Sequence, residues 1–247
     1  MRSPDLTYDK RMTQFDTELG SWSLWGTQES ARALALLDFT WIGLDAQHGR
    51  YDDLRVIDAV AAIHAVRADL PVWVRVRSND DGLIGRALDA GATGVIVPMV
   101  DDAAQAEAAV AASLYAPQGR RSLGPSLQGG GYAGAAGDPA CAVMVETATG
   151  LANCESIAKT PGLKMIFVGP WDLALALGLS LDELLALEGD ASPLVRIAAA
   201  CSAAGIRAGA FAGTPERGRA LLALGFEVVA IATEDSLFAA GAASVLS

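Results

Sequence analysis

The feature that most constrains the fold of this 247-residue chain is an alternation that repeats eight times. A short, near-continuous apolar run is followed by a segment rich in Ala and Leu at helical spacing. Unbroken apolar runs are typical of parallel strands that are covered on both faces. Eight β-then-α units in ~250 residues predict a single (β/α)8 TIM barrel, of the α/β class.

The predicted strands cover residues 20–25, 41–46, 71–76, 94–98, 141–146, 164–169, 206–211 and 227–232. The predicted helices cover residues 31–37, 54–68, 82–90, 103–113, 153–159, 193–204 and 215–224. Gly91, Gly205 and Gly225 follow helical segments, where a left-handed residue often ends a helix. Residues 1–247 are interpreted as one domain, with a polar lead-in at 1–15. The long segment 116–139 is expected to be functional or mobile, and the apolar segment 173–192 could pack against another subunit.

A doubly wound open sheet is the second interpretation of the alternation. That fold would place a Gly-rich phosphate-binding fingerprint directly after the first strand. The sequence there is SWSLWGTQES, which has no such fingerprint. The barrel is therefore favoured, and no nucleotide cofactor is expected.

Charge and cysteine content exclude several classes of partner. The formal net charge is −11, so nucleic-acid phosphates and anionic lipid surfaces should repel the chain. The sequence shows neither a signal peptide nor a membrane span of ~18 apolar residues. Cys141, Cys154 and Cys201 show no metal-binding spacing and are expected to be reduced thiols in a cytoplasmic protein.

Polar residues follow four of the predicted strands. Asp45 and His48 follow the second strand, Arg75 ends the third, Glu146 ends the fifth, and Asp172 follows the sixth. Catalytic groups of TIM barrels lie at the carboxyl ends of the strands. The sequence therefore predicts an active site in which these five side chains converge on one rim.

Glu146 and Asp172 form the most informative pair. Two carboxylates on neighbouring strand ends repel each other unless a cation or a shared proton lies between them. Their hard oxygen atoms suit Mg²⁺ or Mn²⁺, with Co²⁺ as a further option. The alternative for Asp172 is an ordinary helix N-cap.

His48 lies on a Gly-flanked turn and is the candidate general base. His64 lies within a helical run and is expected only to pack there. Asp89, near the end of a helix, could hydrogen-bond His48 and raise its basicity, although from sequence alone it is an ordinary polar helix residue. Arg75 would point into the mouth of the barrel, where a guanidinium stabilises a developing oxyanion.

The scarcity of lysine argues against Schiff-base chemistry. Lys10, Lys159 and Lys164 are the lysines of the chain, and none stands at a strand end on the predicted catalytic rim. A barrel that handles keto acids would then need a metal as its electron sink. Arg120 and Arg121, in the long segment, could bind an anionic substrate or anchor that segment.

Six blocks in order resemble the metal-dependent 4-hydroxy-2-oxoheptanedioate aldolases, which are class II pyruvate or hydroxyketoacid aldolases. The blocks are WIGLDAQHG, VWVR, LDAGATGVIVPMV, PQGRRSLGPS, VMVET and FVGPWDLALALG. The resemblance is close over residues 19–178 and looser elsewhere. It implies a homohexamer, a trimer of dimers, in which a terminal helix is exchanged between subunits.

The resemblance also implies a role for each matching residue. Glu146 and Asp172 would hold the metal, His48 would be the base with Asp89 raising its basicity, and Arg75 would stabilise the enolate oxygen. The backbone at Gly169 and Trp171 would hold the substrate carboxylate, and Asp45 and Met144 would belong to the same rim.

Three positions depart from the family pattern. Gln47 stands where a Glu is frequent, Met144 stands where a Gln is frequent, and Trp171 replaces a small residue. Met144 cannot donate a hydrogen bond to a keto acid, and Trp171 should reshape the acceptor pocket. These departures affect donor and acceptor choice more than the metal.

Three other functions remain as alternatives. A citramalyl-CoA or malyl-CoA lyase would carry basic residues for the CoA phosphates, and a phosphoenolpyruvate-using transferase would need added cations at the mouth. The chain is acidic and poor in lysine, which disfavours both. A non-catalytic keto-acid sensor would not need the His and the Arg.

Overall fold

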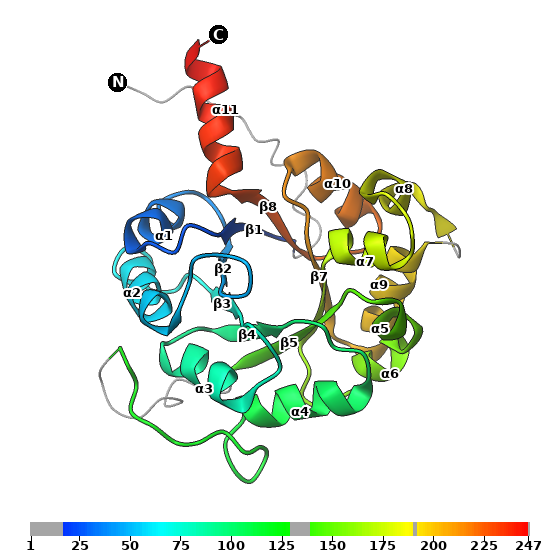
Figure 1. Ribbon diagram of the computed structural model, residues 1–247, viewed down its shortest axis with the longest axis horizontal. Coiled ribbons are helices and arrows are strands. Elements are labelled where there is room, and N and C mark those ends of the chain that lie inside the picture. Colours follow the sequence, from blue (N-terminus) through cyan, green and yellow to red (C-terminus); the bar gives the residue numbers. More distant parts are fainter. Residues whose placement is uncertain (1–16, 129–138, 190–191, 247) are drawn as a thin grey trace.

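The computed structural model describes residues 17–128, 139–189 and 192–246 of the chain (Figure 1). The lead-in predicted at residues 1–15 lies outside the described residues. Part of the long segment 116–139 does so too.

The eight strands form a closed parallel barrel, in which each strand pairs with the next and β8 pairs with β1 (Figure 1). They are β1 Glu18–Ser23, β2 Trp41–Asp45, β3 Val72–Arg75, β4 Gly94–Val97, β5 Ala140–Val145, β6 Met165–Val168, β7 Arg207–Phe211 and β8 Val228–Thr233. Each overlaps a predicted strand, with small shifts at the ends. The predicted (β/α)8 barrel is confirmed.

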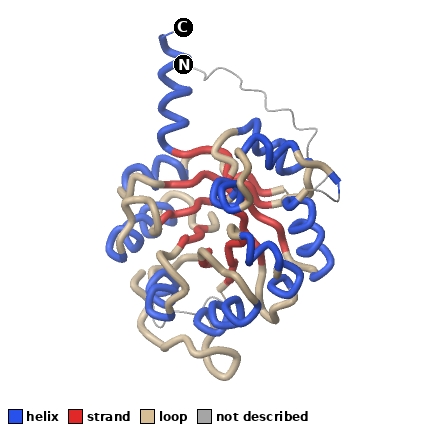
Figure 2. Tube along the Cα trace, turned by 45° about the vertical axis from the view of Figure 1, so that its right-hand side comes forward, coloured by secondary structure: helices blue, strands red, loops and turns tan. Residues whose placement is uncertain are grey.

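The helices surround the strands, as the tube trace shows (Figure 2). They are α1 Gln28–Ala35, α2 Asp53–His64, α3 Asp81–Asp89, α4 Ala103–Ser113, α5 Ala148–Ala152, α6 Cys154–Ala158, α7 Pro170–Ala176, α8 Leu181–Ala186, α9 Pro193–Ala204, α10 Pro215–Ala223 and α11 Glu234–Leu246. Gly91, Gly205 and Gly225 have positive φ angles, as predicted from their places after helical segments. The predicted apolar segment 173–192 contains most of α7 and all of α8.

The barrel interior is filled by alternating large and small side chains. The ring of Trp41 occupies the space where a Cβ on Gly20 would lie, 2.2 Å from the indole, and Trp22 does the same against Gly43. Phe167 lies among these rings at the centre. Close packing of this kind fills the interior of the barrel with side chains.

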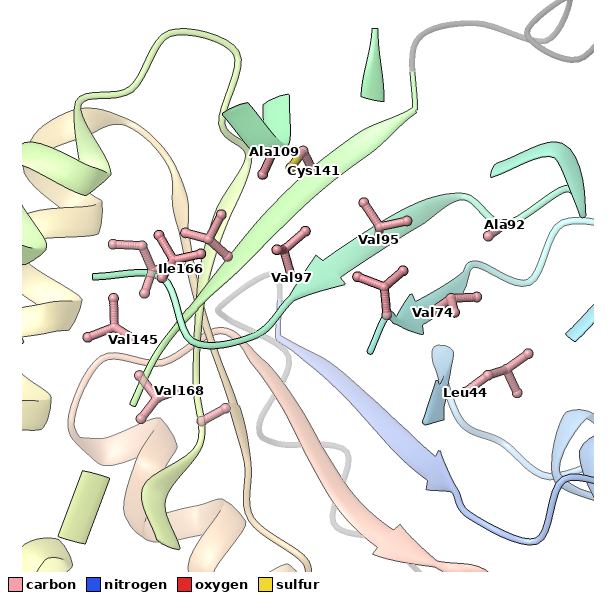
Figure 3. Close-up of a cluster of buried hydrophobic side chains, with 14 of the residues drawn as sticks. Leu44, Val74, Ala92, Val95, Val97, Ala109, Cys141, Val145, Ile166 and Val168 are labelled. Carbon is pink, nitrogen blue, oxygen red and sulfur yellow. The ribbon is translucent and has the colours of Figure 1, made fainter. Parts of the chain in front are cut away.

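A second, larger apolar layer lies between the barrel and its helices. Residues of the opposite strand phase, such as Val97, Val145 and Ile166, pack outward into it (Figure 3). Successive side chains of a strand point to opposite faces. A residue at a strand end that is in phase with the inner layer therefore points over the barrel interior, and one in phase with the outer layer points toward the helices.

The described part of the segment after α4, residues 114–128, lies along helix α3 and contacts both of its ends. Arg120 binds Asp81 at 2.5 Å, and Arg121 binds Asp89 at 2.7 Å. Of the two roles considered for these arginines, the structure shows anchoring of the segment.

Helix α11 extends away from the barrel (Figures 1 and 2). It lies beyond the last helix that periodicity predicts, because its apolar residues do not mark a single buried face. Phe238, Val245 and Leu246 on it are exposed. In the described parts of the chain, no helix has both the length and the apolar character required to traverse a bilayer.

Candidate active site

A cavity of about 230 Å³ opens at the carboxyl-terminal rim of the barrel. Its lining brings together most of the predicted site residues. The lining residues are Trp22, Leu24, Asp45, His48, Arg75, Met144, Phe167, Gly169, Trp171, Asp172 and Phe211.

Strand phase explains why these side chains meet. Trp41 and Asp45 share one face of β2, and Met144 and Glu146 share one phase at the end of β5. Trp41 and Met144 belong to the barrel interior, so Asp45 and Glu146 lie over that interior at the rim. Arg75 is the last residue of β3 and follows the same pattern.

Asp45 is fully buried and organises the centre of the rim. Its carboxylate accepts from Arg75 Nε at 2.9 Å, from Arg75 Nη2 at 2.5 Å and from Trp22 Nε1 at 3.2 Å. Burial raises the pKa of this carboxyl, but the bonds and charge of Arg75 outweigh burial and hold the pKa below its usual range. Asp45 is therefore an anion that fixes Arg75.

The Arg75 guanidinium is aimed over the cavity. It is held in a two-pronged ion pair with Asp45, and its Cζ lies 5.3 Å from the centroid of the Trp22 ring. A planar guanidinium held on two sides keeps one orientation. Arg75 is therefore set in advance to receive an oxygen that gains negative charge.

His48 stands on the turn that follows β2. The backbone N–H groups of Gln47 and His48 donate to Asp45 Oδ1 at 3.0 and 3.1 Å. A Cβ on Gly49 would lie 2.3 Å from the carbonyl oxygen of Asp45, so the turn requires glycine there. The turn places His48 in the cavity lining, and within the described residues no side chain hydrogen-bonds its ring.

Glu146 is 3% exposed and is not itself part of the cavity lining, but its carboxylate lies beside Gly169, which lines the cavity. Met99, which has a φ of 57°, donates its backbone N–H to Glu146 Oε1 at 2.8 Å. Burial raises the pKa of the Glu146 carboxyl, the Met99 bond lowers it in part, and the charge of Asp172 raises it further. A Cβ on Gly169 would lie 2.5 Å from Glu146 Oε2, so glycine is needed beside this carboxylate.

Asp172 lies in the first turn of α7 and is exposed to the cavity. Gly169, not Asp172, is the N-cap of this helix, and it makes no side-chain capping bond. The N-cap alternative for Asp172 is therefore wrong, because Pro170 begins the helix two residues earlier than the apolar pattern indicates. Asp172 is left without the capping role considered for it.

The donor set of Glu146 and Asp172 fits a hard divalent cation. Both groups offer carboxylate oxygens, and their mutual repulsion contributes to the raised pKa of Glu146. A cation between them would relieve that repulsion. Across the described ranges, no group of three or more His, Cys, Asp or Glu side chains gathers in a metal-ligand arrangement, so these two ligands would leave other positions for water and substrate.

Asp89 does not lie beside His48 within the chain. It is the last residue of α3, at the opposite end of the barrel from His48, and its carboxylate binds Arg121. A helix that follows a strand runs back toward the start of the next strand, so the last residue of α3 lies far from the turn after β2. The expected bond from Asp89 to His48 is not formed within the chain.

The sequence analysis missed the aromatic residues of the rim and the backbone amide of Met99. The aromatic residues Trp22 and Phe211 line the cavity, and the alternation of Gly20 with Trp22 and Gly209 with Phe211 could have marked both as inward. Met99 could not have been found, because its role depends on a backbone angle.

Comparison with known proteins places these residues in a family context. The family model described as HpcH/HpaI aldolase/citrate lyase matches residues 19–240. A 2-dehydro-3,6-dideoxy-6-sulfogluconate aldolase of Pseudomonas putida is 35% identical over 239 residues, covering 92% of this chain and 91% of that protein. A hydroxypyruvate/pyruvate aldolase of Rhizorhabdus wittichii is 36% identical over 226 residues, covering 88% of each.

The fold also matches a solved structure. A crystal structure of an HpcH/HpaI aldolase/citrate lyase family protein from Burkholderia cenocepacia superposes with a TM-score of 0.81. It is 28% identical in sequence, and the match covers 96% of both chains.

Proposed function

The chain belongs to the HpcH/HpaI aldolase/citrate lyase family, and we propose that it is a divalent-metal-dependent aldolase. In this proposal it adds the enolate of pyruvate, or of a related 2-keto acid such as hydroxypyruvate, to an aldehyde, and it cleaves 4-hydroxy-2-keto acids in reverse. The similarity to a hydroxypyruvate/pyruvate aldolase supports this donor class. The observation that carries the proposal is the single cavity that joins His48, Arg75 and Asp172 beside Glu146.

Glu146 and Asp172 are the residues that would hold the cation, Mg²⁺ or Mn²⁺. When bound there, a divalent cation supplies a Lewis acid that stabilises negative charge on a substrate oxygen. The substrate carboxylate would lie at the turn formed by Gly169 and Trp171, which lines the cavity.

The protein groups divide the proton and charge handling between them. His48 removes a proton from C3 of the keto acid, directly or through one water. Arg75, fixed by Asp45, holds the enolate oxygen. C3 then forms a bond to the aldehyde carbon, and the aldehyde oxygen takes up a proton. The cleavage direction reverses each step.

The rim offers little to the alternative substrates. A CoA or phosphoenolpyruvate substrate would need free cations at the mouth, but Arg75, the one cation among the described lining residues, is paired with Asp45. The proposed aldolase reaction uses Arg75 while it is paired with Asp45, and it needs no further cation from the chain.

We also propose that the protein is a homohexamer that exchanges α11 between subunits, as the family resemblance implies. An apolar groove of about 930 Å³ lies between α1 and α11, and exposed Phe238 lines it. A second copy of α11 would cover this apolar surface. Light scattering should show a hexamer for the native chain and a smaller species for Phe238→Glu, whereas a native monomer would contradict the assembly.

Cys141, Cys154 and Cys201 are free and buried. Burial raises the pKa of each thiol, which leaves them unreactive. Free thiols are typical of reducing compartments, and we retain the cytoplasm as the proposed location.

Deuterium exchange at C3 of pyruvate tests the proposed function. The native chain, Mg²⁺ or Mn²⁺ and pyruvate in D₂O should cause loss of the methyl signal by NMR, and a chelator should stop the loss. Adding an aldehyde should yield a 4-hydroxy-2-keto acid. Exchange that survives chelation would contradict metal dependence. Exchange without a new carbon–carbon bond would favour the alternative of a keto-acid sensor.

A further inference from the structure

We propose that Trp171 determines acceptor specificity and selects aldehydes that carry an aryl group. This inference rests on the proposed aldolase function, because it concerns the second substrate of the same cavity. The polar side of the cavity, with Asp45, His48, Arg75 and Asp172, is assigned to the keto acid. The aromatic side chains of the lining remain for the aldehyde.

These aromatic rings form a continuous wall from the floor of the cavity, where Trp22 contacts Asp45 and Arg75, to its mouth. Phe167 stacks on Trp22 with ring centroids 5.4 Å apart, and Trp22 lies 5.6 Å from Phe211. Phe211 in turn lies 5.2 Å from Trp171. Phe167 is fully buried, whereas Trp171 is 41% exposed, so the wall ends in an open indole at the mouth.

Three contacts hold the Trp171 indole, and all come from the stretch of chain that runs from the end of β7 into the first turn of α10. Phe211 packs against it, Gly213 approaches so closely that a Cβ would lie 3.3 Å from Trp171 Cη2, and Arg217 Cζ lies 5.3 Å from the ring centroid. The indole therefore bridges two neighbouring connections of the barrel. Because these contacts hold the indole in one orientation, its face is already positioned before a substrate binds.

The charge distribution favours a neutral acceptor. Arg217 contacts Trp171 but is not part of the cavity lining, so it supports the indole from outside. Inside, Arg75 is bound by Asp45. Among the described lining residues, no unpaired cation is left to receive an anionic tail.

A flat apolar group suits this surface better than a short aliphatic one. Aromatic rings gain from offset or edge-on contact with other rings in addition to the apolar area they bury. Trp171 and Phe211 offer such contacts at the mouth, beyond the place where the aldehyde carbon must meet C3 of the keto acid. An aryl group on the aldehyde would therefore lie against Trp171.

The test compares kcat/KM for benzaldehyde, acetaldehyde and 4-oxobutanoate at saturating pyruvate. The native chain should prefer benzaldehyde. In Trp171→Ala the benzaldehyde-to-acetaldehyde ratio should fall about tenfold, in the usual range for a lost pocket contact. Trp171→Phe keeps a ring and should restore part of the ratio. Leu175→Ala, an exposed position on the same helix, should keep the native ratio.

Arg217 is tested as a positioning residue. Arg217→Met should lower the same ratio, and Arg217→Lys, which keeps the charge beside the indole, should recover part of it. A purely structural role would instead lower both rates together. This comparison needs no assumption about folding, since both aldehydes are assayed on one sample.

Two outcomes would overturn the inference. One is a ratio in Trp171→Ala within about twofold of the native value, well short of the expected change. The other is native preference for 4-oxobutanoate, which would indicate anion recognition. Pyruvate exchange in the same samples separates the proposals: its absence from the native chain contradicts the aldolase function, whereas its presence with an unchanged ratio contradicts only the role of Trp171.

Discussion

Acidic side chains are paired with arginine at the amino-terminal end of the barrel, whereas two of them at the carboxyl-terminal rim are not. At the amino-terminal end, Arg207 binds Glu18 at 2.5 Å and Glu227 at 3.2 Å. At the carboxyl-terminal rim, Glu146 and Asp172 repel each other, and the nearby Arg75 is committed to Asp45.

Acids that are matched with cations stabilise the fold, whereas acids left unmatched cost stability unless a ligand compensates them. The Asp89–Arg121 pair belongs with the first kind. The difference between the ends therefore separates the acids that would hold a cation under the proposed function from those that only stabilise the fold.

The largest expected effect comes from Glu146→Gln. Losing one carboxylate should abolish cation binding, and loss of a Lewis acid worth several kcal/mol should slow pyruvate exchange by about 10³-fold or more. NMR exchange assays across a Mn²⁺ titration measure this. Glu227→Gln, the same change at the opposite end, is the matched control and should exchange at the native rate. Equal losses in both variants would erase the distinction between the ends.

The next largest effect is expected for His48→Ala. Removing the general base should slow exchange by ~10²–10⁴-fold, while Mn²⁺ affinity stays near the native value because His48 is not one of the proposed ligands. His64→Ala, at the end of α2, is the control for loss of an imidazole. Native exchange in His48→Ala would reassign the base to another group.

These expectations also show how far the sequence alone leads. Strand ends and strand phase were sufficient to predict that Asp45, His48, Arg75 and Asp172 meet, because the barrel imposes one geometry on every strand. The same geometry places Asp89 at the other end of the barrel, but its partner was not predictable, since that depends on a segment that folds back to bring Arg121 to it.

The support for Glu146 was hidden for a different reason. It comes from the Met99 amide, which points inward only because that residue adopts a positive φ. Local strain of this kind leaves no periodic trace in the sequence.

Arg121→Met tests whether the Asp89 pair is structural. The Arg121 side chain is 2% exposed, and removing one partner of a buried pair should lower the free energy of unfolding by about 3 kcal/mol. Urea denaturation measures this. Glu18→Gln, in a half-exposed pair, should cost only about 0.2–1 kcal/mol. If instead Asp89→Asn slowed exchange with no loss of stability, the predicted partnership with His48 would return.

The smallest effect concerns the exposed pair of Glu155 and Arg196. Their hydrogen bonds lower the pKa of Glu155 to about 2. The pair therefore contributes stability above pH ~4.5, the usual pKa region of a glutamate, and loses it as the pH falls toward 2. Solvent screening should keep the contribution below about 1 kcal/mol. The stability difference between the native chain and Glu155→Gln should shrink as the pH falls from about 4.5, where a free glutamate titrates, to about 2. A constant difference would show that the pair contributes nothing.

Direct measurement of Mn²⁺ binding tests the central claim, that the unmatched acids of the rim hold a divalent cation. Electron paramagnetic resonance of the native chain should show one bound Mn²⁺ per subunit, and both Glu146→Gln and Asp172→Asn should abolish it while Glu18→Gln does not. Retention of the bound ion in both rim variants would contradict the account.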